Sequence, residues 1–519
     1  MTPNRNNGKR LHSATLDEIA AELGAVSATL RLPPETGKTV VDGVSNDSRN
    51  VRPGDLFVAI PGTADDGGKF VADALRAGAS AIIHQGAPLP GTAPENAAPR
   101  LEVADARMAY ALLAEMFQGN PARRMELCAI TGTNGKTTTA FLLREILAAS
   151  NGKCALISTV ERSWPGTKLD ARWTTPDPME LQKTLADALD AGCGRAVLEA
   201  SSHALHQKRL GSAKCAVAIF TNLSGDHLDY HRDMESYYQA KKILFDAHLD
   251  ADGTAVVNVD DPAGKRLFGE IRGNRAAISL GTRENDDFKI SDMETDISGT
   301  SFSLRLPSGE ILHVETPLVG NFNAFNAASA AVAAISLGVP PKTAADTLRS
   351  ARGAPGRMEK VASNPLVVVD YAHTDDALRR VLSTLRSTAS ASRGNGGITV
   401  VFGCGGDRDK TKRPRMAAAA AEFADAVVVT NDNPRTEPAE RIIEDILAGF
   451  PKGFDAVVVE PDREKAIGLA LRNAGADDTV LIAGKGHETY QETNGVRRHF
   501  DDREAAGRQL RLALEKNRP

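Results

Sequence analysis

A chain of 519 residues is too long for a single hydrophobic core, and its length predicts about three domains. A net charge of −5, with no basic run interleaved with aromatic residues, argues against nucleic-acid binding as the main function. The five cysteines form no C-x-x-C pair, which favours reduced thiols over a disulfide framework or a zinc site. Residues 1–30 contain no apolar segment of signal-peptide length and no stretch approaches a membrane span, so we expect a cytoplasmic protein without membrane insertion.

The first block of the chain extends to about residue 122. Its segments at 55–60, 79–84 and 100–103 are strand-like, and the segment at 70–77 is helix-like. The proline-rich stretch at 87–99 is expected to form a surface loop. These elements indicate a separate N-terminal domain over 1–122.

The second block covers about 123–353 and alternates strands with helices. Its strand-like segments lie at 127–130, 155–159, 195–200, 216–221 and 254–259. This alternation predicts a parallel sheet with helices on its faces, and ligand sites in such sheets lie beyond the carboxyl ends of the strands. The stretch 287–319 differs, because alternating segments joined by a Pro-Ser-Gly turn indicate a small antiparallel annex.

The run Thr131-Gly-Thr-Asn-Gly-Lys-Thr-Thr-Thr139 lies between a strand-like and a helix-like segment. In this context glycines let backbone N–H groups approach phosphate oxygens, and the helix N-terminus adds positive potential. Lys136 is expected to reach the outer phosphates of ATP, and Thr137 to offer its hydroxyl to Mg²⁺. The usual G-x-x-x-x-G-K-[ST] spacing is absent because residue 130 is isoleucine. The alternative is a glycine-rich turn that caps a structural helix.

Two further groups in this block are candidates for metal or phosphate binding. Glu199 closes a strand and could hold Mg²⁺ against the phosphates, with a carboxylate that caps the following helix as the alternative. His227 lies in a turn dense in polar groups, in the same predicted crevice. Lys241 and Lys242 open a helix-like run at 241–248, where a lysine pair usually marks a solvated face.

The third block starts near residue 354 and repeats the alternation, with strands at 366–369, 398–402, 426–430, 456–459 and 479–482. Charged residues follow the ends of these strands. Arg408 and Arg435 suit bidentate binding of a carboxylate, and Asp432 and Glu488 suit an ammonium group. Together they predict a site for a zwitterionic amino acid, with a structural ion-pair network as the alternative.

Taken together, these runs resemble the Mur ligases, the ATP-dependent amide-forming enzymes of peptidoglycan precursor synthesis. The resemblance covers nearly the whole chain, and Gly132-Thr-Asn-Gly-Lys-Thr137 is similar to the family's own short phosphate loop. It implies an α/β protein with three domains: an N-terminal UDP-sugar-binding domain at 1–122, a central P-loop parallel-sheet ATPase domain at 123–353, and a C-terminal Rossmann-like amino-acid-binding domain at 354–519. It also implies that ATP and Mg²⁺ are the cofactors.

The resemblance implies residues for the nucleotide, for the first substrate and for metal. The nucleotide contacts are Gly132, Thr133, Asn134, Gly135, Lys136, Thr137, Thr138, Asn326, Arg357, Asp370 and His373. The contacts to UDP-MurNAc-L-Ala-D-Glu are Asn46, Ser48, Thr63, Ala64, Asp65, Thr174, Thr175, Ser201, Gln207 and Arg209. The catalytic residues are Lys136, Glu199, His227 and Lys241. The metal site consists of Thr137, Glu199, His227 and Lys241, the last as a carbamate formed with CO₂.

The run Asp432-Asn-Pro-Arg435 is similar to the version of the family that adds meso-diaminopimelate. Diaminopimelate differs from lysine by a distal carboxylate, and Arg435 would pair with it. With lysine the arginine would stay unpaired, at a cost of about 1–3 kcal/mol. The diaminopimelate contacts implied by the resemblance are Arg408, Asp432, Asn433, Pro434, Arg435, Gly484 and Glu488. The chain departs from the family pattern at Trp173, where asparagine is common, and at Asp375, where proline is usual.

Three other functions are compatible with parts of the pattern. A lysine-adding homologue or a folylpolyglutamate-type ligase would share the ATP machinery, but the N-terminal uridine-site match and Arg435 oppose both. A non-catalytic nucleotide-binding switch would leave the charged strand ends of the third block without a role. We expect a monomer that acts on small-molecule substrates and binds no nucleic acid.

Overall fold

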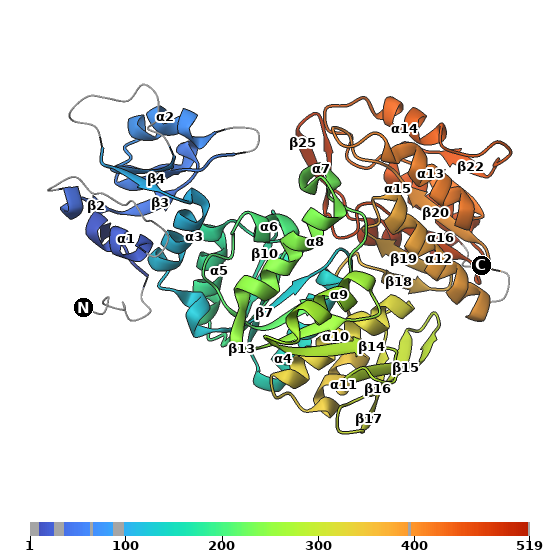
Figure 1. Cartoon of the computed structure of the whole chain (residues 1–519). Helices are drawn as coiled ribbons and strands as arrows, with labels where there is room; N and C mark the ends of the chain where they lie inside the picture. Colours follow the sequence, from blue (N-terminus) through green and yellow to red (C-terminus); the bar gives the residue numbers. More distant parts are fainter. Residues whose placement is uncertain (1–9, 25–35, 63–65, 87–97, 393–395, 517–519) are drawn as a thin grey trace. The chain divides into compact units, whose positions relative to one another are not determined.

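The computed structural model describes residues 10–24, 36–62, 66–86, 98–392 and 396–516 (Figure 1). The chain divides into two compact units, Met1–Gly281 with Val332–Val339, and Thr282–Ala331 with Pro340–Pro519. Each unit is built on mainly parallel sheets with helices on their faces. None of the described helices has the length and apolar character needed to cross a lipid bilayer.

The first unit begins with a small parallel sheet in the order β3-β4-β5-β6. Alternate residues of its strands face opposite sides, so Leu56 and Val58 pack with α1 and α3, whereas Phe57 and Ala59 pack with α2. The elements are β3 (Gly43–Ser45), β4 (Asp55–Ala59), β5 (Ala81–Gln85), β6 (Arg100–Val103), α1 (Leu16–Leu23), α2 (Val71–Arg76) and α3 (Ala106–Phe117). A short pair of strands, β1 (Ala14–Thr15) and β2 (Val40–Val41), precedes the sheet. The three strands predicted for the first block are confirmed.

The central sheet of the first unit runs in the order β10-β9-β8-β11-β7-β12-β13-β14. From β8 to β14 the neighbours are parallel, while β9 and β10 form an antiparallel hairpin. The strands are β7 (Glu126–Thr131), β8 (Cys154–Ile157), β9 (Glu161–Trp164), β10 (Thr167–Asp170), β11 (Arg195–Glu199), β12 (Cys215–Phe220), β13 (Leu249–Asn258) and β14 (Ala276–Gly281). The predicted parallel sheet is confirmed, and the carboxyl ends of its strands meet at one edge.

Helices follow most strands of this sheet. They are α4 (Lys136–Asn151), α5 (Pro178–Asp190), α6 (Ser202–His206), α7 (Leu228–His231), α8 (Met234–Ile243) and α9 (Pro262–Ile271). Asp233 caps α8, and a π-helical turn over Leu244–His248 continues it. The prediction that Lys241 opens a helix is therefore wrong, because Lys241 lies in the last turn of α8.

The second unit starts with the antiparallel strands β15 (Phe288–Thr295), β16 (Thr300–Arg305) and β17 (Ile311–Thr316), which confirms the predicted annex. Helix α10 (Asn321–Ser336) contributes residues to both units, and α11 (Pro341–Ser350) packs on β17.

The main sheet of the second unit has the order β18-β19-β23-β20-β21-β22 and is parallel except for its edge strand β18. Its strands are β18 (Glu359–Ser363), β19 (Leu366–Asp370), β20 (Ile398–Phe402), β21 (Ala426–Val429), β22 (Val457–Val459) and β23 (Thr479–Ala483). Leu366 and Val368 pack with α12 (Asp375–Ser392), α13 (Lys412–Phe423) and α14 (Ala439–Leu447). Val367 and Val369 pack on the other side with α15 (Arg463–Asn473) and α16 (Asp502–Lys516). A hairpin of β24 (Tyr490–Thr493) and β25 (Val496–His499) follows β23.

Candidate active site

The phosphate loop connects β7 to the first residue of α4, as the sequence predicts. Gly132 and Gly135 have φ angles of 143° and 87°, which side chains with a Cβ rarely adopt. A Cβ on Gly132 would also lie 1.9 Å from Oγ1 of Thr221, so only glycine fits there. The Lys136 ammonium donates to the carbonyl oxygens of Gly132 and Thr133 at 3.0 and 2.9 Å and therefore lies over the loop.

The segment after β12 braces this loop from the side. Oγ1 of Thr221 donates to the Asn134 carbonyl at 2.6 Å, and Oδ1 of Asn222 accepts from the Asn134 backbone N–H at 3.0 Å. The Ser224 backbone N–H donates to Oγ1 of Thr133 at 3.0 Å. The loop is thus held in shape by residues about ninety positions away in the chain.

Glu199 is fully buried at the end of β11, directly beside the loop. Its Oε2 accepts from the Thr137 hydroxyl at 3.0 Å and from the Thr159 hydroxyl at 3.1 Å, and its Oε1 accepts from the Thr159 backbone N–H at 2.8 Å. The alternative of a helix-capping carboxylate is wrong, because Ser201 caps α6 by accepting from the Ala204 N–H. A buried carboxylate and a hydroxyl side by side are oxygen ligands of the type that Mg²⁺ uses.

Lys241 is also buried against the phosphate loop, with 1% of its surface exposed. Its Nζ donates to the Gly132 carbonyl at 2.7 Å and lies 4.3 Å from the centre of the Tyr237 ring. Burial, and next the nearby Lys136 cation, lower the pKa of Lys241 well below its ordinary value. The solvated-face interpretation is therefore wrong for Lys241. That interpretation suits Lys242 better, because Lys242 forms a 2.7 Å ion pair with Asp246 on the helix surface.

His227 lies at the start of α7 with a positive φ of 54°. Its Nε2 is 3.4 Å from an oxygen of Asp226, and its ring lies 6.1 Å from that of Tyr237. Tyr237 in turn shares a 3.2 Å hydrogen bond with Thr133. One tyrosine ring thus separates His227 from the phosphate loop. Within the described residues, no group of three or more His, Cys, Asp or Glu side chains is arranged to hold a metal ion on its own.

Four of the residues implied for the muramoyl dipeptide form one cluster beyond β11. Oγ1 of Thr175 donates to the Glu199 carbonyl at 2.7 Å and accepts from the Ser201 N–H at 3.0 Å. The Arg209 guanidinium donates to the Thr175 carbonyl at 2.7 Å and to Oε1 of Gln207 at 2.8 Å. Thr174, another residue implied for this substrate, shares a 3.1 Å hydrogen bond with Thr159. Thr159 also contacts Glu199. At the family departure, the Trp173 ring is 52% exposed and 5.9 Å from the Arg209 guanidinium carbon.

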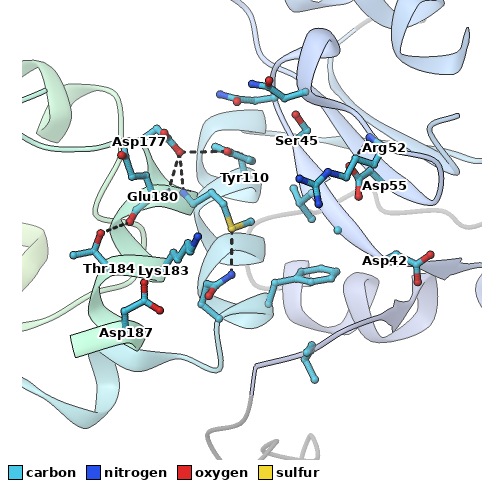
Figure 2. A pocket seen from close by; sticks show the side chains of 18 of the residues that line it. Asp42, Ser45, Arg52, Asp55, Tyr110, Asp177, Glu180, Lys183, Thr184 and Asp187 are labelled. Atoms are coloured by element: carbon cyan, nitrogen blue, oxygen red, sulfur yellow. Dashed lines mark hydrogen bonds between the residues drawn. The ribbon is translucent and has the colours of Figure 1, made fainter. Parts of the chain in front are cut away.

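A pocket of about 660 Å³ opens beside β3, with Asn46 among its lining residues. Figure 2 shows its polar walls, where Asp42, Ser45, Arg52 and Asp55 come from the N-terminal elements and Asp177, Glu180, Lys183, Thr184 and Asp187 from the start of α5 onward. The side chain of Tyr110 reaches Asp177 at 3.4 Å across it. Ser48 lies just after β3 in a short turn capped by Asp47. Thr63, Ala64 and Asp65 fall outside the described residues.

In the second unit, three of the implied nucleotide contacts gather at the end of β19. Asp370 is buried and accepts from the Met358 backbone N–H at 2.6 Å. Burial raises the pKa of Asp370, while the nearby Arg357 cation opposes that shift. The Arg357 guanidinium carbon lies 4.5 Å from the centre of the Tyr371 ring, and the His373 ring lies 4.6 Å from it. The fourth implied contact in this unit, Asn326, is buried on α10 and donates to Asn323 at 2.9 Å.

The two loops expected to bind the acceptor amino acid meet in the second unit. Asn433 donates to Oε2 of Glu488 at 2.8 Å. Gly484 has a φ of 113°, and a Cβ there would lie 2.7 Å from Oδ2 of Asp432, so the Asp432 carboxylate lies against the glycine. Burial, and next the Asp432 charge, raise the pKa of Glu488. The structure therefore brings Asp432, Asn433, Gly484 and Glu488 together.

The two predicted carboxylate-binding arginines lie on adjoining loops. Arg435 has a φ of 55° and donates to the Gly406 carbonyl at 2.7 Å. A Cβ on Gly406 would lie 1.9 Å from the Pro434 carbonyl oxygen, so the two loops are in direct contact. Arg408 follows two residues after Gly406 and its side chain is exposed.

The sequence interpretation gave no role to two buried cations of this region. Lys485 is fully buried between Asn433 and Glu488, at 3.2 and 3.3 Å. Arg463 is 1% exposed and forms two 2.7 Å bonds with Asp502. The sequence marks both positions as unusual. Lys485 stands between two glycines after an apolar strand. Arg463 lies in the first turn of a helix, where a cation is unfavourable unless it is paired.

Three protein-family models match this chain. The model of the Mur ligase middle domain matches residues 130–334, that of the Mur ligase glutamate ligase domain matches 356–486, and that of the Mur ligase catalytic domain matches 40–118. A UDP-N-acetylmuramoyl-L-alanyl-D-glutamate--2,6-diaminopimelate ligase of Gloeobacter violaceus is 44% identical over 482 residues, which are 92% of this chain and 94% of that protein. The chain belongs to the Mur ligase family.

Solved structures of Mur ligases and their relatives agree with this membership. A structure of a UDP-N-acetylmuramoyl-L-alanyl-D-glutamate--2,6-diaminopimelate ligase superposes with a TM-score of 0.68 at 34% identity and covers 97% of this chain and 99% of its own. The predicted three-domain Mur ligase fold is therefore confirmed. A folylpolyglutamate synthase of Mycobacterium tuberculosis has a TM-score of 0.60 at 19% identity and covers 73% of this chain and 92% of its own, which is a similarity of fold alone.

Proposed function

We infer that this Mur ligase is an ATP-dependent enzyme that joins meso-diaminopimelate to UDP-MurNAc-L-Ala-D-Glu in peptidoglycan precursor synthesis. The observation that carries this inference is the acceptor site at the carboxyl ends of β21 and β23. Arg435 and the carboxylates of Asp432 and Glu488 offer opposite charges there for a zwitterionic amino acid. Arg435 supplies a cation for the distal carboxylate that distinguishes diaminopimelate from lysine.

ATP with Mg²⁺ would phosphorylate the D-glutamate side-chain carboxylate, which gives an acyl phosphate and ADP. The amine of the acceptor would then attack the acyl carbon, and the amide forms as phosphate and a proton leave. The phosphate loop fits this role through Lys136, Thr137 and the backbone N–H groups at the start of α4. Glu199 and the Thr137 hydroxyl are proposed to hold Mg²⁺, and the 3.0 Å hydrogen bond between them supports this. Arg357, Asp370, His373 and Asn326 of the second unit are also proposed as nucleotide contacts.

Lys241 is proposed to carry a carbamate formed with CO₂. A neutral amine attacks CO₂, releases one proton and becomes a carboxylate, and the lowered pKa of Lys241 favours the neutral amine. The carboxylate would add a metal ligand beside the phosphate loop, with His227 close by. Labelling with ¹³C-bicarbonate tests this. A carbamate resonance is expected in the wild type and in Lys242→Met but not in Lys241→Met, and a signal that persists in Lys241→Met would contradict it.

The first substrate is proposed to lie along the first unit. Thr174, Thr175, Ser201, Gln207 and Arg209 would hold the muramoyl dipeptide next to Glu199. The Asn46 pocket has the volume of a small-molecule site, and Asn46 and Ser48 would contact the uridine nucleotide together with Thr63, Ala64 and Asp65. We further propose a cytoplasmic monomer, with domain boundaries near residues 122 and 353.

Product analysis tests the proposed function directly. Mass spectrometry of a reaction containing ATP, Mg²⁺, UDP-MurNAc-L-Ala-D-Glu and meso-diaminopimelate should show one new amide product and equimolar ADP. A product formed with L-lysine instead would keep the ligase and overturn the acceptor assignment. ATP hydrolysis without an amide product, or binding without turnover, would favour the nucleotide-binding switch.

A further inference from the structure

Lys485 lies inside the acceptor site although its side chain is fully buried. It stands between Gly484 and Gly486, whose φ angles of 113° and 52° turn the chain sharply after β23. Its Nζ donates to Oδ1 of Asn433 at 3.2 Å and to Oε2 of Glu488 at 3.3 Å. A buried ammonium is costly unless it is paired, so this position requires both partners.

The same oxygen of Glu488 receives a second hydrogen bond. Nδ2 of Asn433 donates to Oε2 at 2.8 Å, so Lys485, Asn433 and Glu488 form a closed triangle of hydrogen bonds. The Glu488 side chain keeps 19% of its surface exposed, so the carboxylate is held on one side and reachable from the other. Oε2 of Glu488 is thus held by two donors, the Asn433 amide and the Lys485 ammonium.

The positive charge of Lys485 affects the protonation of Glu488. Burial and the Asp432 carboxylate raise the pKa of Glu488, whereas the Lys485 cation and its hydrogen bond lower it. Without Lys485, partial burial and the nearby Asp432 charge would favour the protonated form of Glu488. A protonated Glu488 could no longer attract an ammonium group. The other groups that interact electrostatically with Glu488 are Tyr371 after β19, Arg463 on α15, Tyr490 on β24 and Arg497 on β25.

We propose that Lys485 is a positioning residue of the acceptor site, which fixes the Glu488 carboxylate through Oε2 and keeps it charged for the ammonium group of the incoming amino acid. The proposal rests on the proposed function, because it gives Glu488 an amino acid to bind. Lys485 touches Glu488 and Asn433 rather than the reacting atoms, so it acts through Glu488.

The test compares Lys485→Met, which keeps the length and loses the charge, with Lys465→Met on the exposed surface of α15. In the full-length enzyme, Lys485→Met should raise the KM for diaminopimelate by about tenfold to a hundredfold, because a charge-assisted hydrogen bond is lost. The KM for ATP should stay within about twofold in both variants. The acidic limb of the kcat/KM profile for diaminopimelate should move to higher pH only in Lys485→Met.

A second readout is independent of turnover. The carboxyl resonance of ¹³C-labelled Glu488, assigned by its loss in Glu488→Gln, should titrate at higher pH in Lys485→Met than in the wild type. An unchanged Glu488 titration, or equal changes in the KM for ATP and for diaminopimelate, would overturn the proposal. A wild-type enzyme that releases no phosphate with any amino acid would overturn the proposed function instead, and the Glu488 titration would still decide whether Lys485 sets that charge.

Discussion

The hydroxyl of Thr137 donates a 3.0 Å hydrogen bond to the buried carboxylate of Glu199. Thr137 lies in the first turn of α4 and Glu199 at the end of β11, so the bond joins the phosphate loop to the neighbouring strand of the sheet. The same carboxylate also accepts hydrogen bonds from the backbone N–H and the hydroxyl of Thr159. The hydrogen bonds to this carboxylate thus come from neutral donors, and its charge would be available to the proposed Mg²⁺.

Glu199→Gln should preserve the fold and remove the charge. The amide oxygen can still accept from Thr159, but the expected loss in kcat is about 100-fold or more, since charge stabilisation dominates phosphoryl transfer. Steady-state kinetics at several Mg²⁺ concentrations measure this. The control is Glu126→Gln, a half-exposed carboxylate at the opposite end of β7 that pairs with Arg195. Equal kcat values for the two variants would remove Glu199 from the metal site.

The lowered pKa of Lys241 makes a prediction about stability and pH. At pH values between the folded-state and unfolded-state pKa of this lysine, the unfolded chain binds one more proton than the folded chain. The free energy of unfolding therefore rises with pH in this range. As pH falls below the ordinary lysine value, the uncarbamylated wild type should lose up to about 1.4 kcal/mol per pH unit that Lys241→Met does not lose. Urea unfolding in CO₂-free buffer at several pH values measures the difference. Parallel pH curves for the two proteins would contradict it, and Lys242→Met serves as the surface control.

Arg435→Asn should weaken acceptor binding selectively. Asparagine tolerates the positive φ of 55° at this position, so the substitution removes the guanidinium with little backbone strain. The KM for diaminopimelate should rise about tenfold to a hundredfold while the KM for ATP changes little. The matched control is Arg441→Asn on the exposed surface of α14. Equal rises in both KM values would mean that Arg435 is structural.

The Arg463–Asp502 pair should be important for the stability of the second unit. Both side chains are fully buried, and Arg463 also donates to the Ala483 carbonyl at 2.9 Å, directly before Gly484. Arg463→Met leaves the Asp502 charge unpaired and should lower the free energy of unfolding by about 3–5 kcal/mol. Adding Asp502→Leu should restore most of that loss in urea unfolding. A single variant as stable as the wild type would contradict this account.

The phosphate loop and the strand-end charges were predictable because they depend on local sequence. A strand, a glycine-rich turn with Lys136 and a helix define a phosphate loop whatever surrounds them, and the apolar segments before Asp370, Asp432 and Gly484 fixed where each strand would end. For the same reason the α/β class followed from the alternation of strands and helices, and the antiparallel annex from alternating segments joined by a Pro-Ser-Gly turn.

Burial was not predictable, because it depends on contacts between distant residues. Lys241 resembles any surface lysine of a helix until its Nζ meets Gly132, which is 109 positions earlier. Lys485 meets Asn433 across 52 positions, and Arg463 meets Asp502 across 39. The family resemblance implied a role for Lys241, but only the packing explains why its pKa is lowered. The sequence marks the positions of Lys485 and Arg463, but only the packing shows that they are buried and which residues they pair with.

Phosphate release from ATP with UDP-MurNAc-L-Ala-D-Glu, measured with meso-diaminopimelate and with L-lysine, would decide both the ligase activity and the acceptor. We expect rapid release with diaminopimelate and little with lysine, because only diaminopimelate has the distal carboxylate that would pair with Arg435. Release with lysine at an equal or greater rate would contradict the role given to Arg435, and release with neither amino acid would contradict the ligase itself.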